Sequence, residues 1–165
     1  MRRVYRIALA QQARDLSGKG ARLTGGRWNP KDTAVIYTSE SRSLAAMEFL
    51  VHVSLTDIPP GIKIVSIDVP ETIVPKEIDP SSLPKDWRRS PAPFSLGDIG
   101  AKWVSRMESL LLRVPSAVVK HEFNILINPN HPDFKSVSII EVENFMYDER
   151  FHKQSKSRRN APELP

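Results

Sequence analysis

The stretch between residues 25 and 48 indicates the fold, and it reads GGRWNPKDTAVIYTSESRSLAAME. Its middle part, residues 34–38, has the β-branched and aromatic composition of a short strand. Ser39 and Ser41 follow, and serine is a good N-cap residue for the apolar segment that comes next. The pattern therefore predicts a strand that passes directly into a helix over residues 41–55.

Glu48 is the residue of this predicted helix that most needs an explanation. Between residues 44 and 53 the only ionisable side chains are Glu48 and His52, and the others are apolar. A helix this apolar is expected to be mostly buried, and an unpaired buried charge is costly. We therefore expect the Glu48 carboxylate to be paired, to be neutralised or to face a cleft, as a candidate functional acid. His52 is interpreted as a satisfied core histidine.

Arg27 and Tyr37 add two further chemistries to the same stretch. An arginine beside glycines can hold a pyrophosphate bidentately, because glycine permits close backbone approach, although a structural salt bridge explains Arg27 equally well. Tyr37 offers a ring for a flat heterocycle. A turn over residues 29–32 predicts that strands near 23–28 and 34–38 pair and bring Arg27 and Tyr37 together.

The rest of the chain predicts an α+β domain with a mixed, bent or split sheet and flanking helices. Its elements do not alternate as regular βαβ units. Residues 62–69 are largely apolar at both odd and even positions, so both faces of this strand would be buried. We expect it to lie centrally in the sheet. Trp87 is interpreted as a surface aromatic anchor. Further strands are expected over residues 4–8, 114–119, 123–128 and 137–142, with a second helix over 95–112.

Length and composition fit one domain in a soluble, cytoplasmic protein. The chain has 165 residues and lacks an apolar run of the roughly 20 residues that a membrane span needs. Its N-terminus lacks the apolar core of a signal peptide. The absence of cysteine excludes disulfides, iron–sulfur clusters and cysteine-type zinc sites, and the 4 histidines show no ligand spacing. We expect no metal and no membrane contact.

The net charge of +5 is concentrated at the C-terminal end. Residues 150–165 hold five positive side chains and one negative, so the remainder carries about +1. A nearly neutral body gives little support for a nucleic-acid surface, and we predict no direct nucleic-acid binding. We expect residues 1–153 to form a single catalytic domain and residues 154–165 to form a disordered basic tail.

Together these motifs resemble the RES domain family. The resemblance rests on the stretch 25–48, on Asp86-Trp87-Arg88, and on the segments RVPSAVV (113–119) and NILINPNHPDF (124–134), in order along the chain. The family is named for an arginine, a glutamate and a serine. In this sequence they correspond to Arg27, Glu48 and Ser116, with Tyr37 as the usual aromatic companion.

The resemblance implies an ADP-ribosyltransferase-like fold and a toxin that consumes NAD as its substrate. Glu48 and Ser116 would be catalytic, and Arg27 and Tyr37 would bind NAD. The implied partner is an antitoxin of the Xre helix-turn-helix type. A homodimer or a larger toxin–antitoxin assembly is compatible with it.

The chemistry of NAD cleavage fits these side chains. Breaking the nicotinamide–ribose bond builds oxocarbenium character on the ribose, which a carboxylate such as Glu48 would stabilise. Ser116 is expected to position groups by hydrogen bonding, because no histidine neighbours it in sequence. Asn124 matches a polar position of the family but is explained equally well as a strand-end hydrogen bonder, and it is left out of the predicted site.

Three functions stay open from the sequence. The first is an NAD glycohydrolase toxin, and the second is an ADP-ribosyltransferase that uses the same NAD site to modify a protein. The third is a non-catalytic protein-binding module whose polar cluster is structural.

Overall fold

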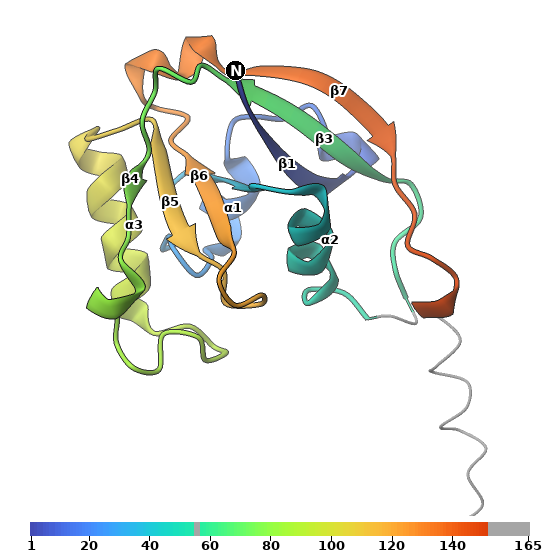
Figure 1. The fold of residues 1–165 in the computed structure, drawn as a ribbon, viewed down its shortest axis with the longest axis horizontal. Helices are drawn as coiled ribbons and strands as arrows, with labels where there is room; N and C mark the ends of the chain where they lie inside the picture. The colour runs from blue at the N-terminus through green and yellow to red at the C-terminus, as the bar shows by residue number, and fades with distance from the viewer. Residues whose placement is uncertain (55–56, 152–165) are drawn as a thin grey trace, which may run out of the picture.

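The structure is a computed structural model that describes residues 1–54 and 57–151. Its centre is one seven-stranded sheet with the strand order β4-β5-β6-β2-β1-β3-β7 (Figure 1). Among the strands of the described residues, only β4 and β5 pair in parallel. The strands are β1 (Arg2–Leu9), β2 (Ile36–Ser39), β3 (Ile62–Val69), β4 (Lys76–Glu77), β5 (Leu111–Pro115), β6 (Phe123–Ile127) and β7 (Ser138–Asn144). The predicted α+β class with a mixed sheet is confirmed.

The sheet is split between β1 and β2. These strands share a single registered pair, Tyr5 with Ser39, whereas β1 and β3 pair along eight residues. In Figure 1, β4, β5 and β6 lie on the left beside α3, and β1, β3 and β7 lie on the right. The split leaves the facing edges of β1 and β2 apart over most of their length, and it is there that the molecule is hollow.

The helix that carries Glu48 is α2 (Arg42–Leu50), which lies beneath the junction of β1 and β2 (Figure 1). Ser41 caps it as predicted, because its Oγ accepts a hydrogen bond of 3.1 Å from the Leu44 amide. The expectations of a helix to residue 55 and of a mostly buried helix were wrong. Its buried residues are Leu44 and Ala45, while Met47 is exposed and Val51 follows the last turn in solvent.

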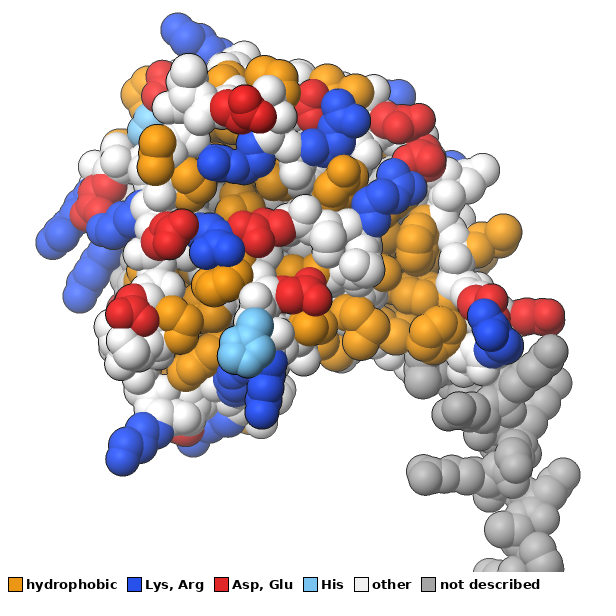
Figure 2. Space-filling model, viewed as in Figure 1, with side chains coloured by type: hydrophobic (Ala, Val, Ile, Leu, Met, Phe, Trp, Pro, Cys, Tyr) orange, Lys and Arg blue, Asp and Glu red, His pale blue; other side chains and the backbone are white. Residues whose placement is uncertain are grey.

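An apolar surface therefore remains at this end of the molecule. Figure 2 shows hydrophobic side chains gathered over α2 and the segment that follows β7. Met146 in that segment is among the most exposed large apolar side chains described. Phe145 and Phe151 each pack edge to face against Tyr147.

The segment before Arg27 is helical, and the predicted strand near residues 23–28 was wrong. Residues Lys19–Thr24 form α1, which ends where Gly25 takes a positive φ of 73°. The chain then turns tightly, with a single bridge between Gly26 and Asn29. The left-handed conformation at Gly25 ends the helix, because glycine adopts it without a steric penalty.

The second long helix, α3 (Phe94–Arg106), is shorter than predicted because Met107 takes a left-handed conformation after it. The next strand, β5, consequently begins earlier, and Ser116 lies just after β5 and not inside it. β3 is interior but not central, since only β7 lies beyond it. The described part of the chain also contains three short 3-10 helices: η1 (Ala10–Gln12), η2 (Pro80–Ser82) and η3 (Pro132–Ser136).

Two apolar clusters hold the layers together. One joins β1 and β3 to β5 and β6 and includes Val4, Val65, Leu111 and Ile125. The other lies under α3 and includes Trp28, Trp87, Leu96 and Trp103, so the prediction that Trp87 is a surface anchor was wrong. The second cluster fixes the loop around Trp87 to the segment that carries Arg27.

Gly100 is the point of closest contact between α3 and that segment. A Cβ atom at this position would lie 1.7 Å from the carbonyl oxygen of Trp28. Gly100→Ala should therefore lower the free energy of unfolding by roughly 3 kcal/mol through overpacking, as measured by denaturant titration. Gly20→Ala in α1 is the control, since a Cβ at that position would meet nothing outside its own helix within 4 Å. Unchanged stability of Gly100→Ala would contradict this packing.

Candidate active site

Glu48 lies at the centre of a hydrogen-bond network that joins three elements. Its Oε1 accepts hydrogen bonds from Ser116 Oγ at 2.7 Å and from Asn124 Nδ2 at 2.6 Å. Among the described residues, no donor contacts Oε2. The predicted pairing of the carboxylate is confirmed in geometry, and one carboxylate oxygen stays available for a ligand.

The hydroxyl of Ser116 has a fixed role in this network. Its oxygen accepts hydrogen bonds from the amides of Val118 and Val119, both at 3.0 Å, in the turn after β5. With both acceptor positions filled, its proton points to Glu48. Ser116 therefore donates to the Glu48 carboxylate, and its positioning role stays a prediction.

Asn124 belongs to the same site, although it was not among the predicted site residues. It stands opposite Ser39 in the β2–β6 ladder, so the two side chains share one face of the sheet. Ser39 Oγ donates to Asn124 Oδ1 at 2.7 Å, which turns the amide NH₂ toward Glu48. The strand-end interpretation was correct about position, but the partner is the candidate catalytic carboxylate.

Two adjoining cavities open at the split of the sheet. The smaller, of about 190 Å³, is lined by residues that include Glu48, Asn124, Tyr37 and His52. The larger, of about 600 Å³, runs between the edges of β1 and β2 and along α1. Four residues line both cavities, and they are Arg6, Ile7, Tyr37 and Phe49. A ligand longer than one ring and one sugar can therefore extend from Glu48 into the second cavity.

Tyr37 is a fixed wall between these cavities. Its hydroxyl donates to Asn29 Oδ1 at 2.7 Å and accepts from the Trp28 amide at 3.0 Å. Burial raises the pKa of Tyr37, so the phenol stays protonated. A Cβ at Gly26 would lie 2.7 Å from this hydroxyl, which explains the second glycine of the pair. The hydroxyl is thus used for structure, and the ring is left to contact a ligand.

Arg27 lies close to Glu48 but does not line either cavity. Its Nη1 and Nη2 donate to the carbonyl oxygens of Trp87 and Arg89 at 2.5 and 3.1 Å. Burial lowers the pKa of Arg27, and the charge of Glu48 opposes that shift. The structure therefore brings Tyr37, Glu48 and Ser116 into one site and places Arg27 at its border, tied to the loop of residues 84–93.

Arg6 is a second functional candidate that was absent from the predicted site. It lines both cavities, and Nη2 donates to the carbonyl oxygens of Gln12, Ala13 and Asp15. Its Nε is buried without a hydrogen-bond partner in the described part of the chain. Burial lowers the pKa of Arg6, with Asp15 opposing the shift. The guanidinium is a fixed cation beside both cavities, which suits an anionic ligand group.

His52 also departs from its prediction. It is exposed at the rim of the smaller cavity, so its interpretation as a core histidine was wrong. The cause is the early end of α2, after which the chain turns away from the sheet. Within residues 1–54 and 57–151 there is no cluster of acidic, histidine or cysteine side chains that could hold a metal ion. No helix in the same part of the chain is long and apolar enough to cross a membrane.

Comparison with known proteins agrees with the motifs that form this site. The family model described as the RES domain matches residues 3–152. This chain belongs to the RES domain family. The residues predicted from the RES resemblance, Arg27, Tyr37, Glu48 and Ser116, all fall within the matched region.

Two relatives show how closely this RES chain resembles named proteins. "Prs ADP-ribosylating toxin" of Sphingobium sp. (strain YBL2) is 39% identical over 150 residues, which cover 90% of this chain and 93% of that protein. "Toxin Res" of Yersinia enterocolitica serotype O:8 / biotype 1B (strain NCTC 13174 / 8081) is 36% identical over 149 residues, with 89% and 97% covered.

A solved structure confirms the fold. A chain in the crystal structure of the M. tuberculosis MbcT-MbcA toxin-antitoxin complex superposes with a TM-score of 0.71 at 18% identity. The match covers 94% of this chain and 88% of that one. At this level of identity the likeness shows the shared fold.

Proposed function

We propose that this RES chain is the toxin of a toxin–antitoxin system and that it cleaves the nicotinamide–ribose bond of NAD. The observation that carries the proposal is Glu48, whose carboxylate lines the smaller cavity with Oε1 held by Ser116 and Asn124 and Oε2 open. A fixed anion with a free oxygen can stabilise the positive charge that develops on the ribose.

Each of the other residues would contact a different part of NAD or hold Glu48 in place. The ring of Tyr37 would contact nicotinamide, and Arg6 would bind the pyrophosphate between the two cavities. Arg27 would support the anionic part of NAD from the border of the site or through the loop that it holds. Ser116 and Asn124 would keep Glu48 oriented, because both donate to the same carboxylate oxygen.

The reaction needs few groups because nicotinamide leaves as a neutral molecule. The bond between C1′ of the ribose and the pyridinium nitrogen breaks, and both electrons of that bond stay with nicotinamide. A water oxygen then bonds to C1′ and loses one proton, which yields ADP-ribose. Glu48 stabilises the charge on the sugar between these events.

An ADP-ribosyltransferase is the second candidate function. In that case a protein side chain replaces water as the nucleophile and the residues around Glu48 keep their roles. The observation that favours it is the name of the Sphingobium relative, which describes ADP-ribosylation, together with 39% identity over nearly the whole chain.

We also propose that an antitoxin controls this activity. The superposed structure is of a toxin-antitoxin complex. An Xre-type helix-turn-helix partner could place an acidic or C-terminal carboxylate at the cleft of Arg27, Tyr37 and Glu48, where arginine would bind it. Such a segment would exclude NAD from the site.

Expression in cells tests the toxin and the antitoxin proposals together. Expressed alone, the chain should lower cellular NAD and arrest growth, and co-expression with a neighbouring helix-turn-helix protein should restore both. The control is the Glu48→Gln variant expressed to the same level, which should leave growth and NAD nearly normal. Abundant, folded wild-type protein without an effect on growth or NAD would favour the non-catalytic binding module.

A further inference from the structure

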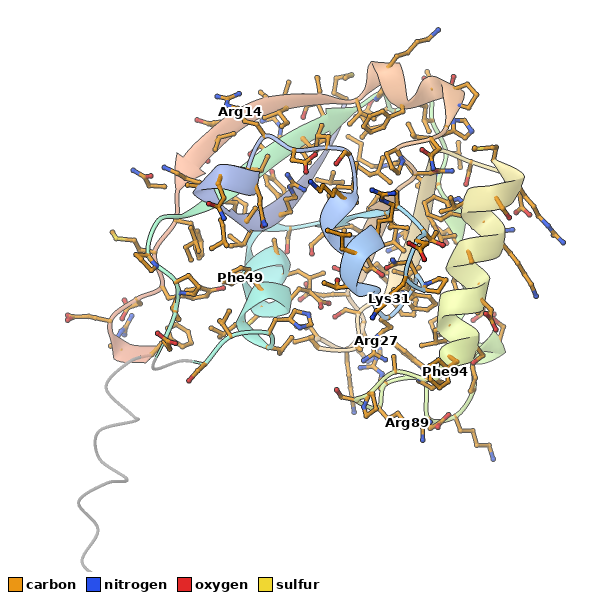
Figure 3. All side chains as sticks on the ribbon, turned by 180° about the vertical axis from the view of Figure 1, so that it is seen from behind. Arg14, Arg27, Lys31, Phe49, Arg89 and Phe94 are labelled. Carbon is orange, nitrogen blue, oxygen red and sulfur yellow. The ribbon has the colours of Figure 1, made fainter. Side chains whose placement is uncertain are left out.

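Several cations and an exposed aromatic ring lie beside the candidate active site. We name this group the basic rim; it comprises Lys31, Lys85, Arg88, Arg89 and Phe94, and it adjoins Arg27. Figure 3 shows Arg27, Lys31, Arg89 and Phe94 on one side of the molecule, near the N-terminal end of α3. Two contacts join the segments of the rim, since Arg27 donates to the Arg89 carbonyl and Gly97 of α3 lies against Pro30.

The basic rim is positive because most of its cations have no carboxylate partner. Residues 25–32 and 85–94 contain five positive side chains and two negative ones, Asp32 and Asp86. Within the described chain, Arg89 is the only rim cation in an ion pair, with Asp86 at 3.2 Å. Arg88 instead lies over the Trp87 ring, 4.5 Å from its centroid.

Several cations elsewhere in the molecule are neutralised by carboxylates. Ion pairs with aspartate or glutamate engage Arg3, Arg42, Lys76, Arg113 and Arg150. The basic rim therefore concentrates unneutralised charge in a body whose net charge is small. Such a concentration attracts an oppositely charged partner and speeds its association.

Phe94 supplies an apolar contact within this charge. It is the first residue of α3, and its side chain is 96% exposed. An aromatic ring between arginines matches the composition of protein-interface cores, in which aromatic residues and arginine are enriched. The basic rim thus fits an acidic polypeptide segment that carries an apolar side chain.

The position of the rim indicates what that polypeptide does. No rim residue lines either cavity. A partner on the rim would lie beside bound NAD and leave it in place. An acceptor of ADP-ribose must leave NAD bound, whereas an antitoxin segment that blocks the site would displace it. We propose that the basic rim docks an acidic segment of a protein acceptor, an inference that rests on the proposed cleavage of NAD.

The transfer balances without a further reactant. An oxygen or nitrogen nucleophile of the docked protein bonds to C1′ of the ribose as the bond from C1′ to nicotinamide breaks. The nucleophile loses a proton to solvent, and nicotinamide leaves with the bonding electrons. Docking raises the local concentration of this nucleophile above what chance encounter with the site would give.

The test compares two triple variants that make the same kinds of change. Lys31→Glu, Arg89→Glu and Phe94→Ser alter the rim, and Arg14→Glu, Lys135→Glu and Met146→Ser form the control. Figure 3 shows Arg14 at the opposite end of the molecule from Phe94. Each purified protein is incubated with radiolabelled NAD, with and without soluble cell protein. Both protein-bound label and free nicotinamide are measured.

We expect the rim variant to label proteins at least 10-fold less than wild type. Its release of nicotinamide without added protein should be unchanged, and the control should match wild type in both measurements. Poly-L-glutamate should compete with labelling by wild type without reducing nicotinamide release.

Several results would overturn the proposal. The first is that the rim variant labels proteins as strongly as wild type. The second is that wild type releases nicotinamide but labels no protein. The third is that the rim variant loses nicotinamide release to the same extent as it loses protein labelling. Competition by a short DNA duplex but not by poly-L-glutamate would assign the rim to nucleic acid. A wild type that releases no nicotinamide would instead contradict the proposed function itself.

Discussion

Replacing Glu48 with glutamine should reduce the rate of nicotinamide release from NAD by roughly 10²- to 10³-fold, the usual loss for one electrostatic stabiliser. Glutamine keeps the size of the side chain, and its amide oxygen can still accept from Ser116 and Asn124. It removes the negative charge that would face the developing oxocarbenium. The loss should therefore appear in kcat, with a small change in KM.

Glu122→Gln is the matched control for this change. Glu122 is exposed and does not line either cavity, so its substitution should leave the rate unchanged. Thermal unfolding of the Glu48→Gln protein shows whether the fold is intact. A folded Glu48→Gln protein with the wild-type rate would remove this residue from the mechanism.

Arg6→Gln should raise the KM for NAD by roughly 10- to 100-fold, because a hydrogen bond to a charged group contributes about 1.5–3 kcal/mol. The effect should exceed that of Arg27→Ala, since both Nη atoms of Arg27 already bind backbone carbonyls. Substrate titration of nicotinamide release measures both constants. The exposed Arg14 provides the control, and Arg14→Gln should keep the wild-type KM.

Arg6 also anchors residues 12–15, so Arg6→Gln can weaken the fold as well as binding. Arg6→Lys separates the two effects, because lysine keeps the charge but not the planar fork of donors. It should be folded and still show a raised KM. A wild-type KM in both folded variants would show that Arg6 does not contact the phosphates.

The centre of the site was predictable because it depends on local sequence. Ser41 caps α2 and the apolar residues after it place the helix, so Glu48 lies on a helix that follows β2 directly. Ser116 was placed through the family resemblance, and the structure joins it to Glu48 at 2.7 Å. The strand pattern of residues 62–69 also matches β3 in both bounds.

Arg6 and Asn124 could not be found in the same way. Arg6 lies on a strand of ordinary composition, and its importance comes from the split between β1 and β2, which is a tertiary feature. The signal for Asn124 was a polar residue in an otherwise apolar strand, FNILI. Polar strand residues with a purely structural role give the same signal, and only the distance from Asn124 to Glu48 shows that Asn124 belongs to the site.

The incorrect elements share a physical cause. Local composition favoured a strand near residues 23–28 and a longer helix after Ser41, but left-handed Gly25 and the departure of the chain from the sheet after Leu50 determine the ends. The predicted disordered tail at residues 154–165 lies outside the described residues. Chain ends and turns depend on contacts that a linear pattern does not contain.

Quantification of free nicotinamide after incubation of the purified chain with NAD tests the central claim most directly. We predict that wild-type protein releases nicotinamide and that Glu48→Gln, measured beside it, releases roughly 10²- to 10³-fold less. Folded wild-type protein that releases no nicotinamide, with or without added cell protein, would contradict the proposed cleavage of NAD.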